Sequence, residues 1–528
     1  MEREYIVALK EGVDYDQFWN EIENLSPTDS FVPSRRVDIV NERPGSLRSC
    51  HYSLTDEEAA MLRNDPRVQV VEIPPSQRKD IQIGLRRRQT SNFTKTTSDS
   101  GNYVNWGLIR CISPTNNYGT GNEVAGDFTY SLDGTGVDVV IQDSGIQVDH
   151  PEFQDYNGVN RVQQINWYTA SGIPGTQSAN HYRDYDGHGT HVAGVVAGKT
   201  YGWAKNSRIY AMKINGLEGA GDSNTGISVE ECFDLIKLWH RNKPIDPTTG
   251  HKRPTIVNMS WGYGTNIANI LGGVYRTDPW VDNTRHPEYG MVGALNPFTG
   301  LYRVDVRVDS VDIDVEEMLA EGIHICIAAG NSYQKIDIPD GQDYDNYYTT
   351  DLGAGETLDI FYHRGGSPHG NNALIVGSID SVVHDASTEQ KSVFSNCGPG
   401  VSIYAPGSNI MSCTSTTNSW GAGSQPYYLN SSYRQTNISG TSMASPQVCG
   451  LGAQLLQLNP SLTPAQLKER ILEEGQNVIY STGFDTDYTD NRSISNGTTK
   501  VIYQKFSGEQ PYSASGGITL TQVNMRLM

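Results

Sequence analysis

The chain has 528 residues, and at roughly 150 residues per domain this length predicts about two to four domains. It carries 60 acidic and 40 basic residues, for a formal charge of −20. This balance argues against nucleic acid and against an anionic membrane surface as partners, because both need clustered Lys and Arg. Hydrophobic residues make up 37% and charged residues 19%, which predicts a packed core rather than a disordered chain.

The first residues, MEREYIVALKEG, contain no apolar run of the signal-peptide kind, and no stretch of 18 apolar residues occurs that could span a membrane. The seven cysteines are dispersed without a CxxC pair, so they favour free thiols over a zinc site or a disulfide framework. These features predict a cytoplasmic or non-classically released protein, and a virus-encoded one fits as well.

Residues 1–75 read as a small separate domain. Helical spacing covers 16–25, and Thr55 to Glu58 form a capping box that opens a second helix. Strand-like segments lie at 5–9, 37–40, 51–54 and 68–73. The order β-α-β-β-α-β predicts a ferredoxin-like α+β domain.

Residues 76–103 lose this periodicity and read as a linker, rich in Ser and Thr. They include the basic run Arg86–Arg88. Such a triplet is typical of solvated charge, and a processing site is the alternative.

Residues 104–478 alternate apolar strands with helices, which predicts an α/β domain with a mainly parallel central sheet. The expected helices include 228–240, 315–321 and 463–473, and the expected strands are 137–142, 209–214, 255–259, 323–328 and 373–379. Residues 479–528 form a tail that suggests short strands but no role.

Two segments of this domain place a polar side chain where chemistry is expected. In the first, VVIQDSG, an apolar strand ends in Asp143, and strand ends in open α/β sheets are where catalytic groups gather. Alone this motif is a weak indication of a catalytic site, since a strand followed by Asp and a turn is common.

In the second segment, DGHGTHVAGVVAG, His188 opens a helix of small residues that can pack closely. His191 is interpreted as a packing or hydrogen-bonding residue, because no third metal ligand follows at zinc-like spacing.

A third segment, SGTSMASPQV, places Ser442 at the start of a helix that runs to Leu458. The free N–H groups of a helix N-terminus suit a nucleophile whose product is an oxyanion. Helix capping by Ser or Thr is the simpler reading, but it does not account for the whole string.

Together, in the order Asp, His, Ser, the three segments resemble those of the subtilisin-like serine proteases. The resemblance implies a three-layer subtilisin-like fold and peptide-bond hydrolysis through an acyl-enzyme. In it Ser442 is the nucleophile, His188 the general base and Asp143 the residue that orients the imidazole. It also implies that Asn331, in IAAGN, donates its amide to the oxyanion.

The same resemblance assigns a substrate-binding strand to the segment NMSWG. An extended peptide would pair with this backbone as an added strand. The pocket for the residue before the scissile bond is expected between two walls, which comprise Ser260, Trp261 and Gly262 on one side and Ala328, Ala329 and Gly330 on the other.

Finer comparison favours the proteinase K-like branch, on the segments NWGLIR, DHPEF and KTYGWAK. No cofactor is required by this chemistry. The segment after the His188 helix lacks the longer loop with which some subtilisins hold calcium, so a structural calcium stays open and no ligand set is legible.

Residues 1–75 resemble the inhibitory propeptide of these proteases, with cleavage expected between Pro74 and Trp106. The chain departs from the family in two insertions, 262–309 and 332–370, which we interpret as a cleft rim that narrows substrate choice; a surface role is the alternative. The acidic residues of 337–351 would bias the cleft toward basic peptides.

The sequence thus predicts a self-processing serine endopeptidase, whose partners are an extended peptide or protein substrate and its own propeptide. Two rival functions stay open. One is a non-proteolytic binding or structural protein, such as a particle component, on the same scaffold. The other is a narrow processing protease for one partner protein.

Overall fold

The structure is a computed structural model, which describes residues 2–24, 31–85, 105–112, 128, 130, 132–155, 157–247, 250–297, 299–385, 388–420, 423–481 and 493–504. Among these residues, no helix combines the length and the hydropathy that a membrane-spanning segment requires. Most of the predicted tail, 479–528, lies outside them.

The N-terminal domain has the predicted β-α-β-β-α-β order, and its four strands form one antiparallel sheet in the order β2-β3-β1-β4. Its elements are β1 (Arg3–Leu9), α1 (Tyr15–Asn24), β2 (Asp38–Asn41), β3 (Ser49–Leu54), α2 (Asp56–Leu62) and β4 (Val68–Glu72). The predicted capping box is confirmed: the Thr55 side chain accepts from the Glu58 N–H and the Glu58 carboxylate accepts from the Thr55 N–H. A separate cluster of buried residues, including Tyr5, Phe18 and Tyr52, forms its core.

The large domain is built on an eight-stranded sheet in the order β22-β23-β18-β17-β14-β8-β6-β7. Neighbouring strands from β18 to β7 run parallel, as predicted. The strands are β6 (Asp138–Asp143), β7 (Arg208–Lys213), β8 (Thr255–Met259), β14 (His324–Ala328), β17 (Leu374–Ile379), β18 (Ile403–Pro406), β22 (Gln476–Asn477) and β23 (Lys500–Val501). Their apolar runs are buried because helices cover both faces of the sheet.

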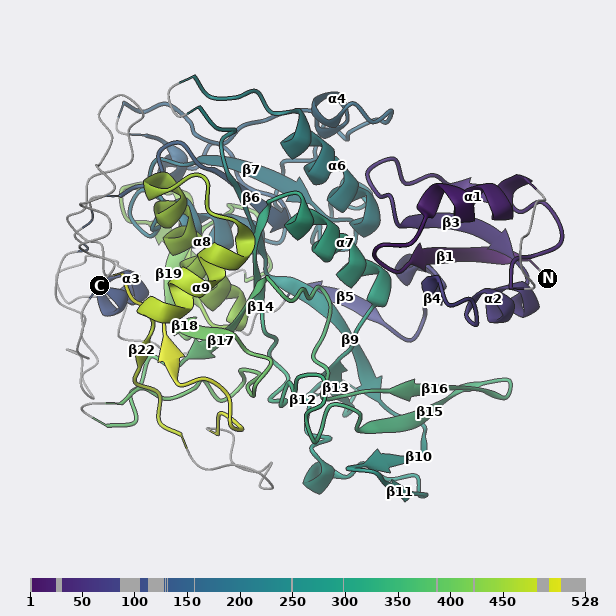
Figure 1. Ribbon diagram of the computed structural model, residues 1–528. Coiled ribbons are helices and arrows are strands. Elements are labelled where there is room, and N and C mark those ends of the chain that lie inside the picture. The colour runs from purple at the N-terminus through teal and green to yellow at the C-terminus, as the bar shows by residue number, and fades with distance from the viewer. Residues whose placement is uncertain are drawn as a thin grey trace.

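Figure 1 shows the three layers of this domain, with α8 and α9 on one face of the sheet and α6 and α7 on the other. The helices are α3 (Trp106–Cys111), α4 (Trp167–Ser171), α5 (His188–Ala197), α6 (Val229–Asn242), α7 (Asp309–Ala320), α8 (Thr441–Leu458) and α9 (Pro464–Glu474). Helix α7 begins six residues before the predicted segment, at Asp309. The reason is a distant partner: the Glu72 carboxylate accepts from the Ser310 N–H at 2.8 Å and caps the helix from the N-terminal domain.

The predicted linker contains ordered structure, which corrects the reading of 76–103 as aperiodic. A short 3₁₀ helix (Pro75–Gln77) is followed by β5 (Gln82–Leu85). This strand has too few residues to stand alone, and it forms because it pairs with β9 (Trp261–Ile267) of the large domain. The alternation Ile81, Ile83, Leu85 was the available sequence signal. The run Arg86–Arg88 lies outside the described residues.

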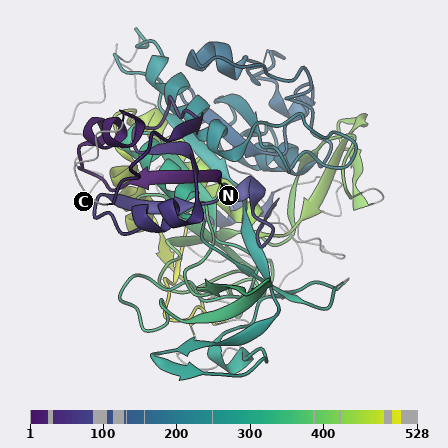
Figure 2. The same ribbon diagram turned by 90° about the vertical axis from the view of Figure 1, so that its right-hand side faces the viewer.

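The two insertions contain strands and share a sheet. β10 (Ile270–Tyr275) and β11 (Asp278–Trp280) of the first pair with β15 (Tyr347–Gly353) and β16 (Glu356–Ile360) of the second, in the order β11-β10-β15-β16. A further sheet has the order β12-β13-β9-β5 and includes β12 (Ala294–Leu295) and β13 (Tyr302–Asp305). Figure 2 shows these sheets below the N-terminal domain, which faces the viewer. A three-stranded sheet of β19 (Ile410–Thr414), β21 (Asn430–Ile438) and β20 (Gln425–Tyr427) completes the domain.

Candidate active site

Asp143 and His188 come together at the carboxyl edge of the central sheet. Asp143 is the last residue of β6 and His188 is the first residue of α5, and both side chains are fully buried. The His188 Nδ1 lies 2.8 Å from Oδ1 and 3.0 Å from Oδ2 of Asp143. A proton on Nδ1 would therefore be held by the carboxylate, leaving Nε2 as the acceptor. That Nε2 atom is buried and has no hydrogen-bond partner among the described residues.

Helix α5 can approach the end of β6 this closely because Gly189 carries no side chain. A Cβ at Gly189 would lie 2.1 Å from the Gly145 carbonyl oxygen. Asp184, which the sequence analysis did not single out, then anchors the helix start. Its carboxylate accepts from the N–H groups of Gly187 and Thr190, at 2.7 and 2.9 Å. Burial raises the pKa of Asp184 to about 6. An Asp just upstream of a helix start was the signal for it.

Ser442 is the second residue of α8, and its hydroxyl is engaged with the substrate-strand segment. Its Oγ donates to the Ser260 carbonyl at 3.0 Å, and the Ser260 hydroxyl donates to the Ser442 carbonyl at 3.0 Å. Asn258 reinforces this contact, because its amide donates to the Ser260 hydroxyl at 2.8 Å. The structure thus places Ser442 directly against Ser260.

Asn331 presents a fixed hydrogen-bond donor beside the start of α8. Its Oδ1 accepts from the N–H and from the hydroxyl of Thr441, at 2.9 and 3.0 Å. Because these two donors fix which end of the amide is the oxygen, the Nδ2 group must point the other way. That Nδ2 is buried and has no hydrogen-bond partner among the described residues. Ser442 follows Thr441, so the free donor lies close to the Ser442 backbone.

The chain's own strand β5 lies along the predicted substrate strand. It pairs antiparallel with β9, and the register places Gly84 opposite Gly262 and Leu85 opposite Trp261. On its other side, a Cβ at Gly216 would lie 3.1 Å from Ile83, so a loop after β7 flanks the same strand. This is the position in which an extended peptide would add to the sheet.

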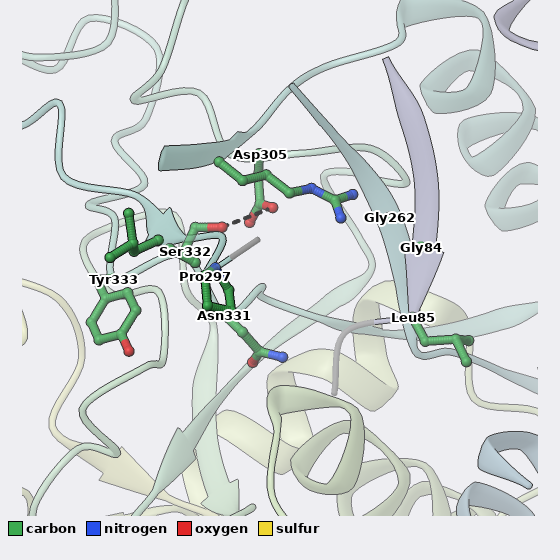
Figure 3. A pocket seen from close by; sticks show the side chains of 11 residues that line it. Gly84, Leu85, Gly262, Pro297, Asp305, Asn331, Ser332 and Tyr333 are labelled. Atoms are coloured by element: carbon green, nitrogen blue, oxygen red, sulfur yellow. Dashed lines mark hydrogen bonds between the residues drawn. The ribbon is translucent and has the colours of Figure 1, made fainter. Parts of the chain in front are cut away.

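A cavity of about 570 Å³ opens between the end of β5 and Asn331. Figure 3 shows that residues from β5, β9, β13 and the segment after β14 surround it. Of the predicted wall residues, Gly262 lines the cavity, whereas Ser260, Trp261, Ala328, Ala329 and Gly330 are not among its lining residues. Asp305, Ser332 and Tyr333 line it instead, and all three lie in or next to the insertions.

His191 has the structural role expected of it. It is fully buried, and its Nε2 lies 3.0 Å from the Ile410 carbonyl and 3.1 Å from the Thr436 carbonyl. Burial lowers its pKa to about 3. Among the described residues, no three His, Cys, Asp or Glu side chains gather in a way that could hold a metal ion.

A buried Asp–His pair, a serine at a helix N-terminus and a free amide donor beside it are the groups that a serine hydrolase of the triad class uses. Comparison with known proteins agrees. Residues 134–494 match the family model described as "Subtilase family", and the chain belongs to this family of serine endopeptidases.

The chain is similar to three named relatives. "Extracellular serine proteinase" of Thermus sp. (strain Rt41A) is 26% identical over 85% of this chain and 75% of its own length. "Subtilisin-like protease 3" of Arthroderma otae is 27% identical over 94% of this chain and 91% of its own length. "Subtilisin-like protease 8" of Trichophyton verrucosum is 27% identical over 79% of this chain, which spans only 63% of that relative.

These relatives overturn the predicted localisation. The cytoplasmic, non-classically released or virus-encoded reading is wrong on this comparison, because the relatives include an enzyme named as extracellular. The prediction rested on the lack of an apolar run near the first residue, and that feature carries no such conclusion.

Proposed function

We propose that this subtilase cleaves peptide bonds with Ser442 as nucleophile and His188 as general base. The free Nε2 of His188 supports the role of base, because Asp143 holds the opposite ring nitrogen. For attack, the Ser442 hydroxyl breaks its hydrogen bond to the Ser260 carbonyl and gives its proton to Nε2 of His188. A catalytic hydrogen bond of this kind, from nucleophile to base, often forms fully only in the substrate complex. His188 then protonates the leaving amine, and Asn331 donates to the oxyanion of the tetrahedral intermediate.

We further propose that the chain is a zymogen, with residues 1–85 as an intramolecular inhibitor. The observation that carries this proposal is the pairing of β5 with β9, since the chain's own segment takes the place of a substrate strand. A peptide held there by its own backbone competes with every substrate, whatever its sequence. The finer placement near the proteinase K-like branch stays a prediction, as does any need for calcium.

A buried charge cluster supports tight docking of the N-terminal domain. Arg43 of this domain is 5% exposed and contacts both α6 and α7. Its guanidinium pairs with Asp234 at 2.7 Å and with Asp314 at 2.8 Å. Lys237 joins the cluster at 3.2 Å from Asp234. A buried charge group of this kind costs free energy to separate, because each partner loses its compensation.

The experiment is N-terminal sequencing of the purified, active protein, with Ser442→Ala as its partner sample. Wild type is expected to begin between Arg86 and Trp106, whereas the Ser442→Ala protein keeps the original N-terminus. Persistence of residues 1–85 in fully active wild type would refute the zymogen proposal.

Two rival functions are separated by simple assays. A serine-directed fluorophosphonate should label wild type and not Ser442→Ala; absence of label in both favours a non-proteolytic binding or structural protein. Casein hydrolysis separates a broad endopeptidase from a narrow processing protease for one partner. One observation favours the narrow processing protease: both insertions contribute residues to the cavity, namely Asp305 and Tyr333.

A further inference from the structure

Asp305 is an acidic residue in the wall of the cavity beside the proposed catalytic residues. It ends β13, in the first insertion, and only 7% of its surface is exposed. Its carboxylate accepts from the Ser332 hydroxyl at 3.1 Å, and Ser332 directly follows Asn331. Figure 3 shows the Ser332 hydroxyl pointing toward Asp305, while the Asn331 side chain points away from it.

Among the described residues, the side chains that donate to this carboxylate are all neutral. Besides Ser332, the Asn396 amide donates to its Oδ2 at 2.7 Å, and no Lys, Arg or His of the described residues forms an ion pair with it. The Asn396 amide also donates to the Ala329 carbonyl at 2.9 Å, so it ties Asp305 to the end of β14. A buried carboxylate with no cation beside it is costly, and proteins normally pair such a charge.

The nearest basic residue on the same strand, Arg303, does not pair with the Asp305 carboxylate. Arg303 also lines the cavity, but its guanidinium donates to the Gln82 carbonyl of β5 at 3.2 Å and packs over Gly84. It therefore holds the inhibitory strand rather than Asp305.

Gly330 keeps the carboxylate in contact with the pocket wall. A Cβ at Gly330 would lie 2.0 Å from the Asp305 Oδ2 and 2.4 Å from the Asn396 amide. The predicted wall segment Ala328–Gly330 thus lies behind this carboxylate. The side chain that Asp305 would meet is the one that enters the cavity between Gly262 and Asn331.

We propose that Asp305 is a specificity-determining residue, which makes the enzyme prefer substrates with Arg or Lys immediately before the scissile bond. The proposal rests on the proposed endopeptidase function. A basic side chain would supply the charge-assisted hydrogen bonds that the carboxylate does not receive from the described residues. A carboxylate at the base of the corresponding pocket has this effect in serine proteases of another fold.

The chain's own sequence agrees with this preference. The strand that lies along β9 ends at Leu85 opposite Trp261, and the next residue in the sequence is Arg86, followed by two more arginines. A self-processing enzyme with a basic preference would find suitable residues directly after the strand that lies in its substrate position.

The test compares matched peptide amides that end in Arg, Lys, Leu or Phe before a fluorogenic leaving group. Wild type is expected to show a kcat/KM for Arg or Lys that exceeds that for Leu or Phe by about 100-fold or more, because a buried charge partner is lost with an apolar side chain. Asp305→Asn keeps the size of the side chain and should reduce this ratio by about 100-fold. Glu356→Gln is the control, since it removes one exposed charge from the second insertion outside the cavity.

Active-site titration with a serine-directed fluorophosphonate normalises every rate and separates the two proposals. Wild type that is not labelled refutes the endopeptidase function itself. Labelled wild type that prefers Leu or Phe overturns the basic preference alone. An Arg preference that survives in Asp305→Asn overturns the assignment to Asp305. If Asp305→Asn fails to fold, Asp305→Glu and competitive inhibition of wild type by benzamidine give the same decision, and no inhibition counts against the proposal.

Discussion

Two buried aspartates, one from each insertion, show how differently the same side chain can be compensated. Among the residues that the structure describes, the side chains that donate to Asp305 in the cavity are a hydroxyl and an amide. Asp343, in the acidic stretch 337–351, pairs instead with Arg276 at 2.7 Å and Lys335 at 2.8 Å. A carboxylate that is paired with cations inside the protein cannot attract a cationic ligand. A carboxylate that is hydrogen-bonded to neutral groups can.

This comparison changes the interpretation of the acidic stretch. The sequence suggested that residues 337–351 bias the cleft toward basic peptides. In the structure Asp343 holds the two insertions together, because Arg276 comes from the first and Lys335 from the second. Asp345 in turn pairs with Arg364 at 2.6 Å. The negative charge that faces the cavity comes from Asp305, which lies outside the stretch.

The largest expected effect tests whether the cavity belongs to a catalytic site at all. Because Ser442→Ala cannot process itself, a small amount of wild-type enzyme first cleaves off its residues 1–85 and is then removed. The cleaved variant should lose about 10⁶-fold in kcat on a peptide amide, as nucleophile removal does in a related subtilisin. Ser445→Ala is the matched control, since it removes a hydroxyl one turn away that donates to Asn258. Equal losses in both variants would contradict the role of Ser442.

Asn331→Leu removes the free amide donor while keeping the size of the side chain. The expected loss in kcat is about 10²–10³-fold with little change in KM, as for the oxyanion donor of a subtilisin. Single-turnover kinetics measure it, and a thermal unfolding scan shows whether the lost contact to Thr441 has disturbed the fold. A rise in KM with kcat unchanged would indicate a role in substrate binding instead.

Arg43→Met tests what happens when buried aspartates that are paired with a cation lose that cation, here at the interface between the two domains. Asp234 and Asp314 then keep buried charges without their main partner, which should weaken retention of the cleaved N-terminal domain by about 2–5 kcal/mol. The measurement is the lag between processing and the appearance of full activity, which should shorten strongly. Arg35→Met is the control, because Arg35 pairs with Glu58 inside the N-terminal domain, and an equal effect there would refute the interface argument.

Asp343→Asn should reduce the free energy of unfolding by about 3 kcal/mol, since two cations lose a buried partner. Burial alone would raise the pKa of Asp343, but Arg276 and Lys335 hold it well below its usual value. A lowered pKa stabilises the fold above the unfolded value of about 4, and this contribution is lost as the pH falls further. Urea unfolding at pH 7 and pH 3 should therefore show a difference between wild type and variant that shrinks in acid. A constant difference would exclude this electrostatic origin.

Much of the architecture follows from local sequence patterns. The parallel strands were predictable because strands buried on both faces read as short apolar runs, as in Thr255–Met259. The N-terminal domain was predictable from its alternation and from the Thr55–Glu58 capping box. The candidate site was predictable because Asp143, His188 and Ser442 each stand at the end of a strand or the start of a helix, and such positions are visible in the sequence.

Other features were decided by the tertiary structure alone, because their partners lie far apart in the chain. Helix α7 begins at Asp309 since Glu72 caps it from another domain, and β5 exists since β9 offers it a free edge. Whether a buried aspartate is paired depends on which distant side chain reaches it, which is why Asp343 and Asp305 look alike in the sequence. Local pattern therefore determined the elements and the catalytic residue types, and only the packing of distant segments decided which charges remain available to a substrate.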